Sequence, residues 1–336
     1  MMNYVIGIDL GGTNIRAAAV TPGGEIFHRI KISSEVEKGK ERVVRNLLDM
    51  IEEIDRRAKG EGRRLISVGL GIPGTIFYDR GVIAQSPNFP DWIDFDLKSR
   101  LAKDISLPFF IDNDANAAAI GEGWLGAGKD EKSFCCLTLG TGIGGGLVFN
   151  GDIWHGEDGM GGEIGHLIVD PDGPACGCGG RGCLETYASA TGIIRMAKES
   201  YYSSDAVGLR ERSNNNIDTV SSEMIYNLAK EGDYYTRDIL RAMSRHLGIG
   251  LADLVNLLNI GLIIIGGGVA AAWDLFIADT IKEMRERSYK VPGERVRIVR
   301  ASCGDDAGIL GAACIALKHS NLIRGLAPSK EREGIL

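Results

Sequence analysis

The sequence has no run or arm of basic residues, and its formal net charge at pH 7 is −7. Proteins that bind nucleic acid or anionic membrane surfaces usually carry a basic patch, so neither partner is expected. The start of the chain lacks the basic region of a secretory signal peptide and soon reaches Asp9, so we expect no export. Phosphate ligands are not excluded, because glycine-rich loops and helix N-termini bind them through backbone N–H groups.

The longest uncharged stretch runs from Leu254 to Trp273, and its 20 residues match the length of a membrane span. It contains Asn256, Asn259 and a glycine triplet, which favours a different interpretation. We predict a helix end, a buried strand at residues 262–265, a glycine turn and a new helix. Because the cysteines are expected to be reduced or metal-bound, the cytoplasm is the predicted compartment.

Neither of two common nucleotide-binding motifs is present in the structural context that it requires. No GxxxxGK[ST] occurs, which excludes a P-loop enzyme. The string from Gly140 to Gly146 fits GxGxxG, but residues 147–149 continue as a strand, whereas the dinucleotide-binding fingerprint opens a helix. Residues 263–268 precede a helix but lack the glycine spacing of that fingerprint, so a nicotinamide-dependent dehydrogenase is disfavoured.

What the chain does contain is the same unit twice. An apolar strand, a glycine turn and a second strand are expected at residues 4–20 and again at 134–150. A unit repeated about 130 residues apart, in a chain of 336 residues, predicts two similar α/β domains that face each other across a cleft.

The remaining elements follow from periodicity. Helices are expected at residues 41–59, 236–258 and 307–317. The second helix is either continuous or broken near Gly248 or Gly250. A strand is expected at 65–70, a polar surface excursion at 201–222 and a frayed tail at 328–336.

The first glycine turn has a carboxylate beside it, in Asp9-Leu10-Gly11-Gly12-Thr13. Glycines let a backbone approach a phosphate closely, and Thr13 adds a hydroxyl donor. A carboxylate beside phosphates requires a cation between them, so we assign Asp9 to Mg²⁺, through water. The alternative, an ordinary glycine-rich hairpin, remains open at this point.

A second polar cluster, Asp112-Asn113-Asp114, follows an apolar strand at residues 109–111. Open α/β sheets bind ligands at the carboxyl ends of their strands, so this position favours a binding or catalytic site. The alternative is a turn that caps a helix, because residues 116–119 suit a helix start.

A metal site is predicted from four residues within 18 positions: His166, Cys176, Cys178 and Cys183. A disulfide would leave one cysteine over and would not involve the histidine. Four nitrogen and sulfur ligands suit a tetrahedral, structural Zn²⁺. The remaining cysteines have apolar neighbours and are expected in the core; they are Cys135, Cys136, Cys303 and Cys314.

These motifs, in this order, resemble the actin/hexokinase-type phosphotransferases, and specifically the ROK family of bacterial sugar kinases and repressors. The resemblance covers nearly the whole chain and is greatest to the glucokinases of that family. It rests on Asp9-Leu10-Gly11-Gly12-Thr13, Pro87-Asn88, Asp112-Asn113-Asp114-Ala115-Asn116-Ala117, residues 139–146, Gly162-Glu163-Ile164-Gly165-His166, the cysteine cluster with Gly182-Cys183-Leu184-Glu185, and Gly266-Gly267-Gly268.

The resemblance implies a role for each matching residue. Asp114 would be the base that activates a sugar hydroxyl, and ATP with Mg²⁺ would be the phosphoryl donor. Further sugar contacts would be Asn88, Asn113, Glu163, His166 and Glu185. The nucleotide would contact Asp9, Gly11, Gly12, Thr13, Gly140, Thr141, Gly142, Gly266, Gly267 and Gly268. Zinc in the module at about residues 160–185 would be held by His166, Cys176, Cys178 and Cys183.

The implied fold is α/β, with two actin-like (ribonuclease H-like, ASKHA) domains around a central cleft. We expect residues 1–118 with 306–322 in the first domain and 119–305 in the second. The implied reaction is phosphorylation of the 6-hydroxyl of a hexose, with glucose first and N-acetylmannosamine, N-acetylglucosamine or fructose as alternatives. A ROK repressor is disfavoured, since a first strand near residue 4 leaves no room for a helix-turn-helix module. A homodimer or higher oligomer is implied by family habit alone.

Overall fold

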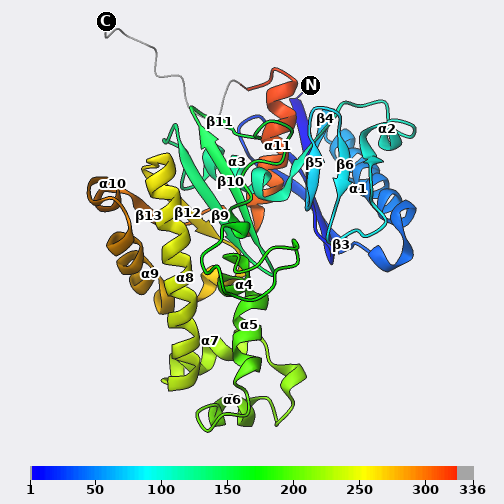
Figure 1. The fold of residues 1–336 in the computed structure, drawn as a ribbon. Helices are drawn as coiled ribbons and strands as arrows, with labels where there is room; N and C mark the ends of the chain where they lie inside the picture. Colours follow the sequence, from blue (N-terminus) through cyan, green and yellow to red (C-terminus); the bar gives the residue numbers. More distant parts are fainter. Residues whose placement is uncertain (1, 324–336) are drawn as a thin grey trace, which may run out of the picture. The chain divides into compact units, whose positions relative to one another are not determined.

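The computed structural model describes residues 2–323 and has a mixed α/β architecture (Figure 1). One five-stranded sheet has the order β3-β2-β1-β4-β8, with bounds Ile26–Ser33, Asn14–Val20, Met2–Leu10, Arg63–Ile72 and Phe109–Asn113. Another has the order β11-β10-β9-β12-β13, with bounds Asp152–Ile153, Ile143–Phe149, Phe134–Leu139, Leu262–Gly266 and Arg297–Arg300. A three-stranded sheet has the order β5-β6-β7, with bounds Thr75–Phe77, Val82–Gln85 and Phe95–Asp96.

Helices connect these strands along the chain. The α-helices are α1 Lys40–Gly60, α2 Leu97–Leu101, α3 Asp114–Leu125, α4 Glu185–Ala188, α5 Ala190–Glu199, α6 Val207–Arg212, α7 Ser222–Glu231, α8 Tyr234–Leu258, α9 Trp273–Arg287, α10 Lys290–Arg295 and α11 Ala307–His319. The 3-10 helices are η1 Val36–Lys38, η2 Ile164–His166, η3 Ile217–Thr219, η4 Gly268–Ala272 and η5 Gly304–Asp306.

Contacts divide the described chain into two compact units. The first contains residues 2–136, 146–162 and 301–323, and the second contains residues 137–145 and 163–300. The domain limits expected from the sequence, at 118/119 and 305/306, stay a prediction.

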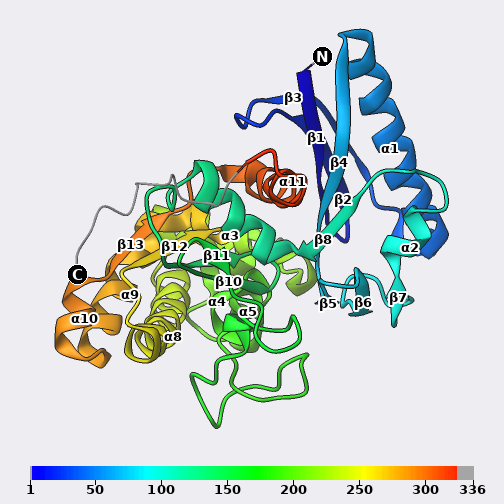
Figure 2. The same ribbon diagram turned by 90° about the horizontal axis from the view of Figure 1, so that it is seen from above.

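In the first unit, the sheet around β1 is covered on both faces. Figure 2 shows α1 on one side of β1 and β4 and α11 on the other. Ile6 and Ile8 belong to the core cluster that includes the apolar face of α1, whereas Val5 packs with residues of α11. This division follows from the two-residue period of a strand. It explains why β1 reads as a continuous apolar run, as strands buried on both faces do.

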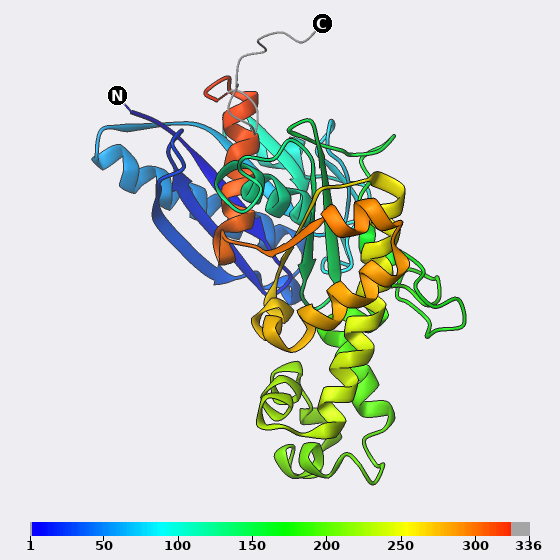
Figure 3. The ribbon, with the colours of Figure 1, turned by 90° about the vertical axis from the view of Figure 1, so that its left-hand side faces the viewer.

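The second unit is mainly helical outside its strands. The long α8 packs against α9, α7 and α5, which surround it in Figure 3. Among residues 2–323, no helix combines the length and the apolar character needed to cross a lipid bilayer.

Most of the expected elements are present with small shifts of their ends, and two expectations needed correction. The stretch 201–222 is not merely a polar excursion, because it contains α6 and η3 and buries Tyr201 and Leu209. Helix α8 continues unbroken through Gly248 and Gly250. At Gly248 a Cβ would lie 2.6 Å from the Cβ of Glu283, so this glycine serves the close packing of α9. The predicted tail at 328–336 lies outside the described residues.

Candidate active site

The first glycine turn is a tight connection between β1 and β2. The backbone N–H of Gly11 donates to the carbonyl of Asn14 at 2.9 Å, and the hydroxyl of Ser34 donates to the carbonyl of Gly11. A Cβ on Gly12 would lie 2.5 Å from the side-chain nitrogen of Asn88. The structure therefore brings together a predicted phosphate loop and a predicted sugar contact that are far apart in the sequence.

Asp9 lies near the end of β1, immediately before this turn. Its Oδ2 accepts a hydrogen bond from Nε of Arg16 at 3.0 Å. A Cβ on Gly308, in the first turn of α11, would lie 2.9 Å from the Asp9 carboxyl carbon. The Asp9 carboxylate is thus held in an ion pair with Arg16 directly before the glycine turn, and its contact with Mg²⁺ stays a prediction.

Asn113 and Asp114 mark the change from β8 to α3. The Asn113 side-chain oxygen accepts from the backbone N–H groups of Ala115 and Asn116, at 2.8 and 3.2 Å, so Asn113 is the N-cap. Its amide nitrogen donates to the carbonyl of Gly74 at 3.1 Å. The capping alternative is thus correct for Asn113, and its role as a sugar contact stays a prediction.

Asp114 is the first residue of α3, and its Oδ1 accepts from the N–H of Ala115 at 2.9 Å. Negative charge is favourable in the first turn of a helix. The carboxylate therefore lies at the carboxyl end of β8, an edge strand of the first sheet, and on the first turn of α3.

The second glycine turn, between β9 and β10, is attached to the segment that follows the metal cluster. The carbonyl of Gly140 accepts from the N–H of Ala190 at 2.8 Å, and the carbonyl of Thr141 accepts from the hydroxyl of Thr191 at 2.7 Å. Glu185 Oε2 accepts from the N–H of Ile143 at 2.8 Å, and a Cβ on Gly142 would lie 2.3 Å from that oxygen. Again a predicted phosphate loop contacts a predicted sugar ligand.

The glycine triplet 266–268 connects β12 to η4 and α9. Gly267 has φ 86°, a left-handed conformation that favours glycine. A Cβ there would lie 2.4 Å from the carbonyl oxygen of Leu139, directly before the Gly140 turn. The two nucleotide loops predicted in the second unit are therefore neighbours.

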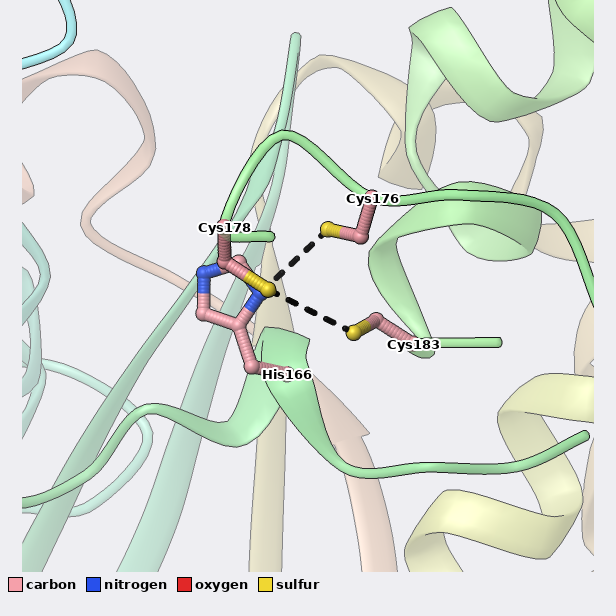
Figure 4. A group of neighbouring side chains, drawn as sticks. All are labelled: His166, Cys176, Cys178 and Cys183. Carbon is pink, nitrogen blue, oxygen red and sulfur yellow. Dashed lines mark hydrogen bonds between the residues drawn. The ribbon is translucent and has the colours of Figure 1, made fainter. Parts of the chain in front are cut away.

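The predicted zinc ligands gather at one point, as Figure 4 shows for His166, Cys176, Cys178 and Cys183. Their ligand atoms all lie within 4.8 Å of one another. A tetrahedral zinc, with Zn–S of about 2.3 Å and Zn–N of about 2.0 Å, separates two sulfurs by about 3.8 Å and sulfur from nitrogen by about 3.5 Å.

The observed separations are 3.7 Å between the sulfurs of Cys178 and Cys183, and 3.6 Å between Cys176 Sγ and His166 Nδ1. The sulfur pair is too far apart for a disulfide. The donor set and its spacing fit a four-coordinate zinc site.

His166 faces two groups with its two ring nitrogens. Nδ1 is directed to the cysteines, whereas Nε2 lies 3.8 Å from Oε2 of Glu163, another predicted sugar contact. This arrangement would let a metal ligand also orient the sugar side of the site, as surrounding hydrogen bonds commonly do around metal centres.

The other cysteines differ from this cluster. Burial raises the pKa of Cys135 and of Cys314 to about 12, and it raises the pKa of Cys303 to about 12 with the help of the nearby Glu122 carboxylate. Cys303 is partly exposed rather than buried, which corrects the expectation of a core position for that residue. All three thiols are protonated at neutral pH.

The chain matches the ROK family over residues 5–319. The chain belongs to the ROK family. A glucokinase of Halalkalibacterium halodurans is 38% identical over 333 residues, which is 95% of this chain and 96% of the relative. A solved ROK family glucokinase from Streptomyces griseus, in complex with glucose and AMPPNP, is 33% identical, covers 94% of this chain and 99% of its own, and has a TM-score of 0.80.

ROK repressors are also similar to this chain. A xylose repressor of Caldicellulosiruptor bescii is 30% identical over 319 residues, which is 95% of this chain and 79% of the repressor. The family and its α/β, actin-like (ASKHA) fold class are thus as expected from the sequence.

One part of the site was not found by sequence reasoning. Asp112 is buried, and its Oδ2 lies 2.8 Å from Nε2 of His155, a residue 43 positions away. No local pattern links these two residues, so only the folded chain reveals the pair.

Proposed function

We propose that this ROK protein is an ATP-dependent glucokinase that phosphorylates the 6-hydroxyl of glucose. The observation that carries the proposal is the position of Asp114, on the first turn of α3 at the end of β8, in a chain 38% identical to a glucokinase. The similarity to a glucokinase solved with glucose and AMPPNP supports both substrates. Repressors of the family are less similar, at 30% identity, so the kinase is favoured.

The proposed reaction is an in-line transfer of the γ-phosphoryl group. Asp114 accepts the proton of the sugar 6-hydroxyl, the hydroxyl oxygen bonds to the γ-phosphorus, and the bond to the β,γ-bridging oxygen breaks to release ADP. Because the transition state is loose, the protein mainly positions the two substrates and balances charge.

The glycine loops would hold the phosphates through their backbones. Their contacts with Asn88, next to Gly12, and with Glu185, next to Gly142, support the proposal because the sugar hydroxyl and the phosphate must meet. Asn113, Glu163 and His166 are the other proposed sugar contacts. Mg²⁺, approached by Asp9, would supply charge neutralisation on the phosphates.

Zn²⁺ is the proposed resident metal of the cluster of His166 and three cysteines. With four protein ligands it has no open position, so its proposed role is structural. It would fix the loop that carries Glu163 and leads into Glu185. The cytoplasmic location and the homodimer or higher oligomer stay predictions.

The test of the proposal compares Asp114→Asn with the matched control Asp49→Asn, an exposed carboxylate on α1. General-base assistance contributes about 10²- to 10⁴-fold, so Asp114→Asn should lower kcat by at least about 100-fold and the control should not. Turnover is followed by ADP release with Mg-ATP and glucose. Retention of more than about a tenth of kcat in Asp114→Asn would remove Asp114 from the role of base.

The sugar is tested in the same assay with glucose, mannose, fructose, N-acetylglucosamine and N-acetylmannosamine. A lead of tenfold or more in kcat/KM for glucose, about 1.4 kcal/mol in transition-state binding, supports a glucokinase. A lead for another sugar would keep the kinase and change the substrate.

A further inference from the structure

Asp112 lies behind the proposed base, and its carboxylate is the centre of a small network. Oδ1 accepts from the backbone N–H of Asn113 at 2.8 Å and from the side-chain amide of Asn116 at 2.9 Å. These two residues flank Asp114 on either side in the chain. Asp112 therefore fixes the end of β8 and the first turn of α3 together.

The other carboxylate oxygen has a partner from a distant segment. Oδ2 accepts from Nε2 of His155 at 2.8 Å, and an ionised carboxylate can only accept, so the proton of this bond is on Nε2. His155 follows β11, and both residues belong to the first unit. The Asp112 side chain is only 7% exposed and that of His155 14%, so water competes little for the bond.

The imidazole is itself held in place by an aromatic neighbour. The rings of His155 and Tyr78 are stacked, with centroids 3.7 Å apart and planes 9° from parallel. Stacking fixes the direction of Nε2, the hydrogen bond fixes the Asp112 carboxylate, and that carboxylate fixes the residues on both sides of Asp114.

We propose that His155 is a positioning residue for phosphoryl transfer, which acts on Asp114 through the buried carboxylate of Asp112. The inference rests on Asp114 being the base proposed above. Reacting atoms must be held closely, and a displacement of about 1 Å can lower a rate by about 100-fold. Loss of the His155 bond would leave a buried acceptor unpaired and release the strand end that carries the base.

Tyr78, Asp112 and His155 line a cavity of about 470 Å³ in the first unit. A second histidine of the same cavity provides a matched control. His319 lines the same cavity and is stacked on Phe110, with ring centroids 4.5 Å apart and planes 9° from parallel. Unlike His155, it makes no hydrogen bond with Asp112 within residues 2–323. The same substitution at the two histidines therefore separates ring packing from the hydrogen bond.

The experiment measures kcat, KM for glucose and for ATP, and unfolding temperature for His155→Phe, His155→Gln and His319→Phe, with Asp114→Asn alongside. Phenylalanine can stack on Tyr78 but cannot donate, whereas the glutamine amide can donate to Asp112. We expect His155→Phe to lower kcat by about 10- to 100-fold with little change in either KM. His155→Gln should recover much of that loss, and His319→Phe should match the wild type.

The inference is overturned if His155→Phe keeps the wild-type kcat, if His319→Phe loses as much, or if glutamine restores nothing. An inactive Asp114→Asn beside a fully active His155→Phe would refute the positioning role alone, whereas an active Asp114→Asn would refute the proposed base. Should His155→Phe fail to fold, Asp112→Asn provides the second measurement. Asp112→Asn, which weakens the bond to His155 without removing either ring, should lower kcat with little change in either KM, and a wild-type kcat in that variant would overturn the inference.

Discussion

Replacing Gly69 by alanine should destabilise the protein, because the backbone of α11 lies directly against β4 at this residue. A Cβ on Gly69 would lie 1.8 Å from the carbonyl oxygen of Ala312, whereas real Cβ contacts essentially never fall below 3.0 Å. The neighbouring Gly7 of β1 has the same relation to the carbonyl of Ile309, at 2.1 Å. The sheet and α11 thus touch through glycines, and the obstacle is backbone, which no rotamer change relieves.

The magnitude follows from what must move. To reach 3.0 Å, α11 has to shift outward by about 1 Å, which loosens its packing in the core cluster of Ile309, Leu310 and Leu317. Overpacking costs about 1–3 kcal/mol and occasionally more. Alanine also restricts the unfolded chain more than glycine does, which offsets about 0.4–1 kcal/mol of this loss of stability. We therefore expect a net loss of about 2 kcal/mol.

Gly60→Ala is the matched control, because it is the same chemical change with the opposite expected sign. Gly60 ends α1, and nothing lies within 4 Å of its added Cβ. Alanine is favoured over glycine in a helix by about 1 kcal/mol, and less at the last residue. The assay is thermal unfolding followed by circular dichroism, in which 1 kcal/mol corresponds to about 2–4 °C.

Gly69→Ala should unfold about 4–8 °C below the wild type and Gly60→Ala at or slightly above it. If the two variants unfold at the same temperature, the close approach of α11 to β4 does not constrain the fold and the reasoning is wrong.

Three further outcomes can be measured. Glu122 is 1% exposed, and its carboxylate accepts from the N–H groups of Ala127, Ser302 and Cys303. Glu122→Ala should therefore lower the free energy of unfolding in urea by about 3 kcal/mol or more, and a decrease below about 1 kcal/mol would contradict this. Metal analysis should find about one zinc per chain in the wild type, and replacement of the exposed ligand in Cys178→Ala should abolish zinc binding. A metal-free wild type would refute the site. Burial lowers the pKa of His246 in the folded protein. The neutral ring therefore contributes stability above the pKa that histidine has in the unfolded chain, and this contribution is lost as the pH falls. His246→Phe should weaken the fall in unfolding temperature between about pH 7 and 5, and an unchanged dependence of unfolding temperature on pH would exclude His246 as its cause.

By itself, the sequence determined the features that depend on neighbours in the chain. The apolar run of β1, the apolar stripe of α1 and the two strand–glycine–strand units follow from backbone sterics and side-chain period, which act locally. The four predicted zinc ligands could be found because a short glycine-rich loop brings them together whatever the rest of the chain does.

Only the tertiary structure decided which distant residues meet. Asn88 lies against Gly12, Glu185 binds the turn at Gly142, and His155 reaches Asp112, although no pattern connects the members of each pair. These contacts depend on strand order and on the paths of the long connections, which bring together residues tens of positions apart. For the same reason the sequence did not show that glycines of β1 and β4 admit the backbone of α11, since that close approach exists only once the last helix packs against the first sheet.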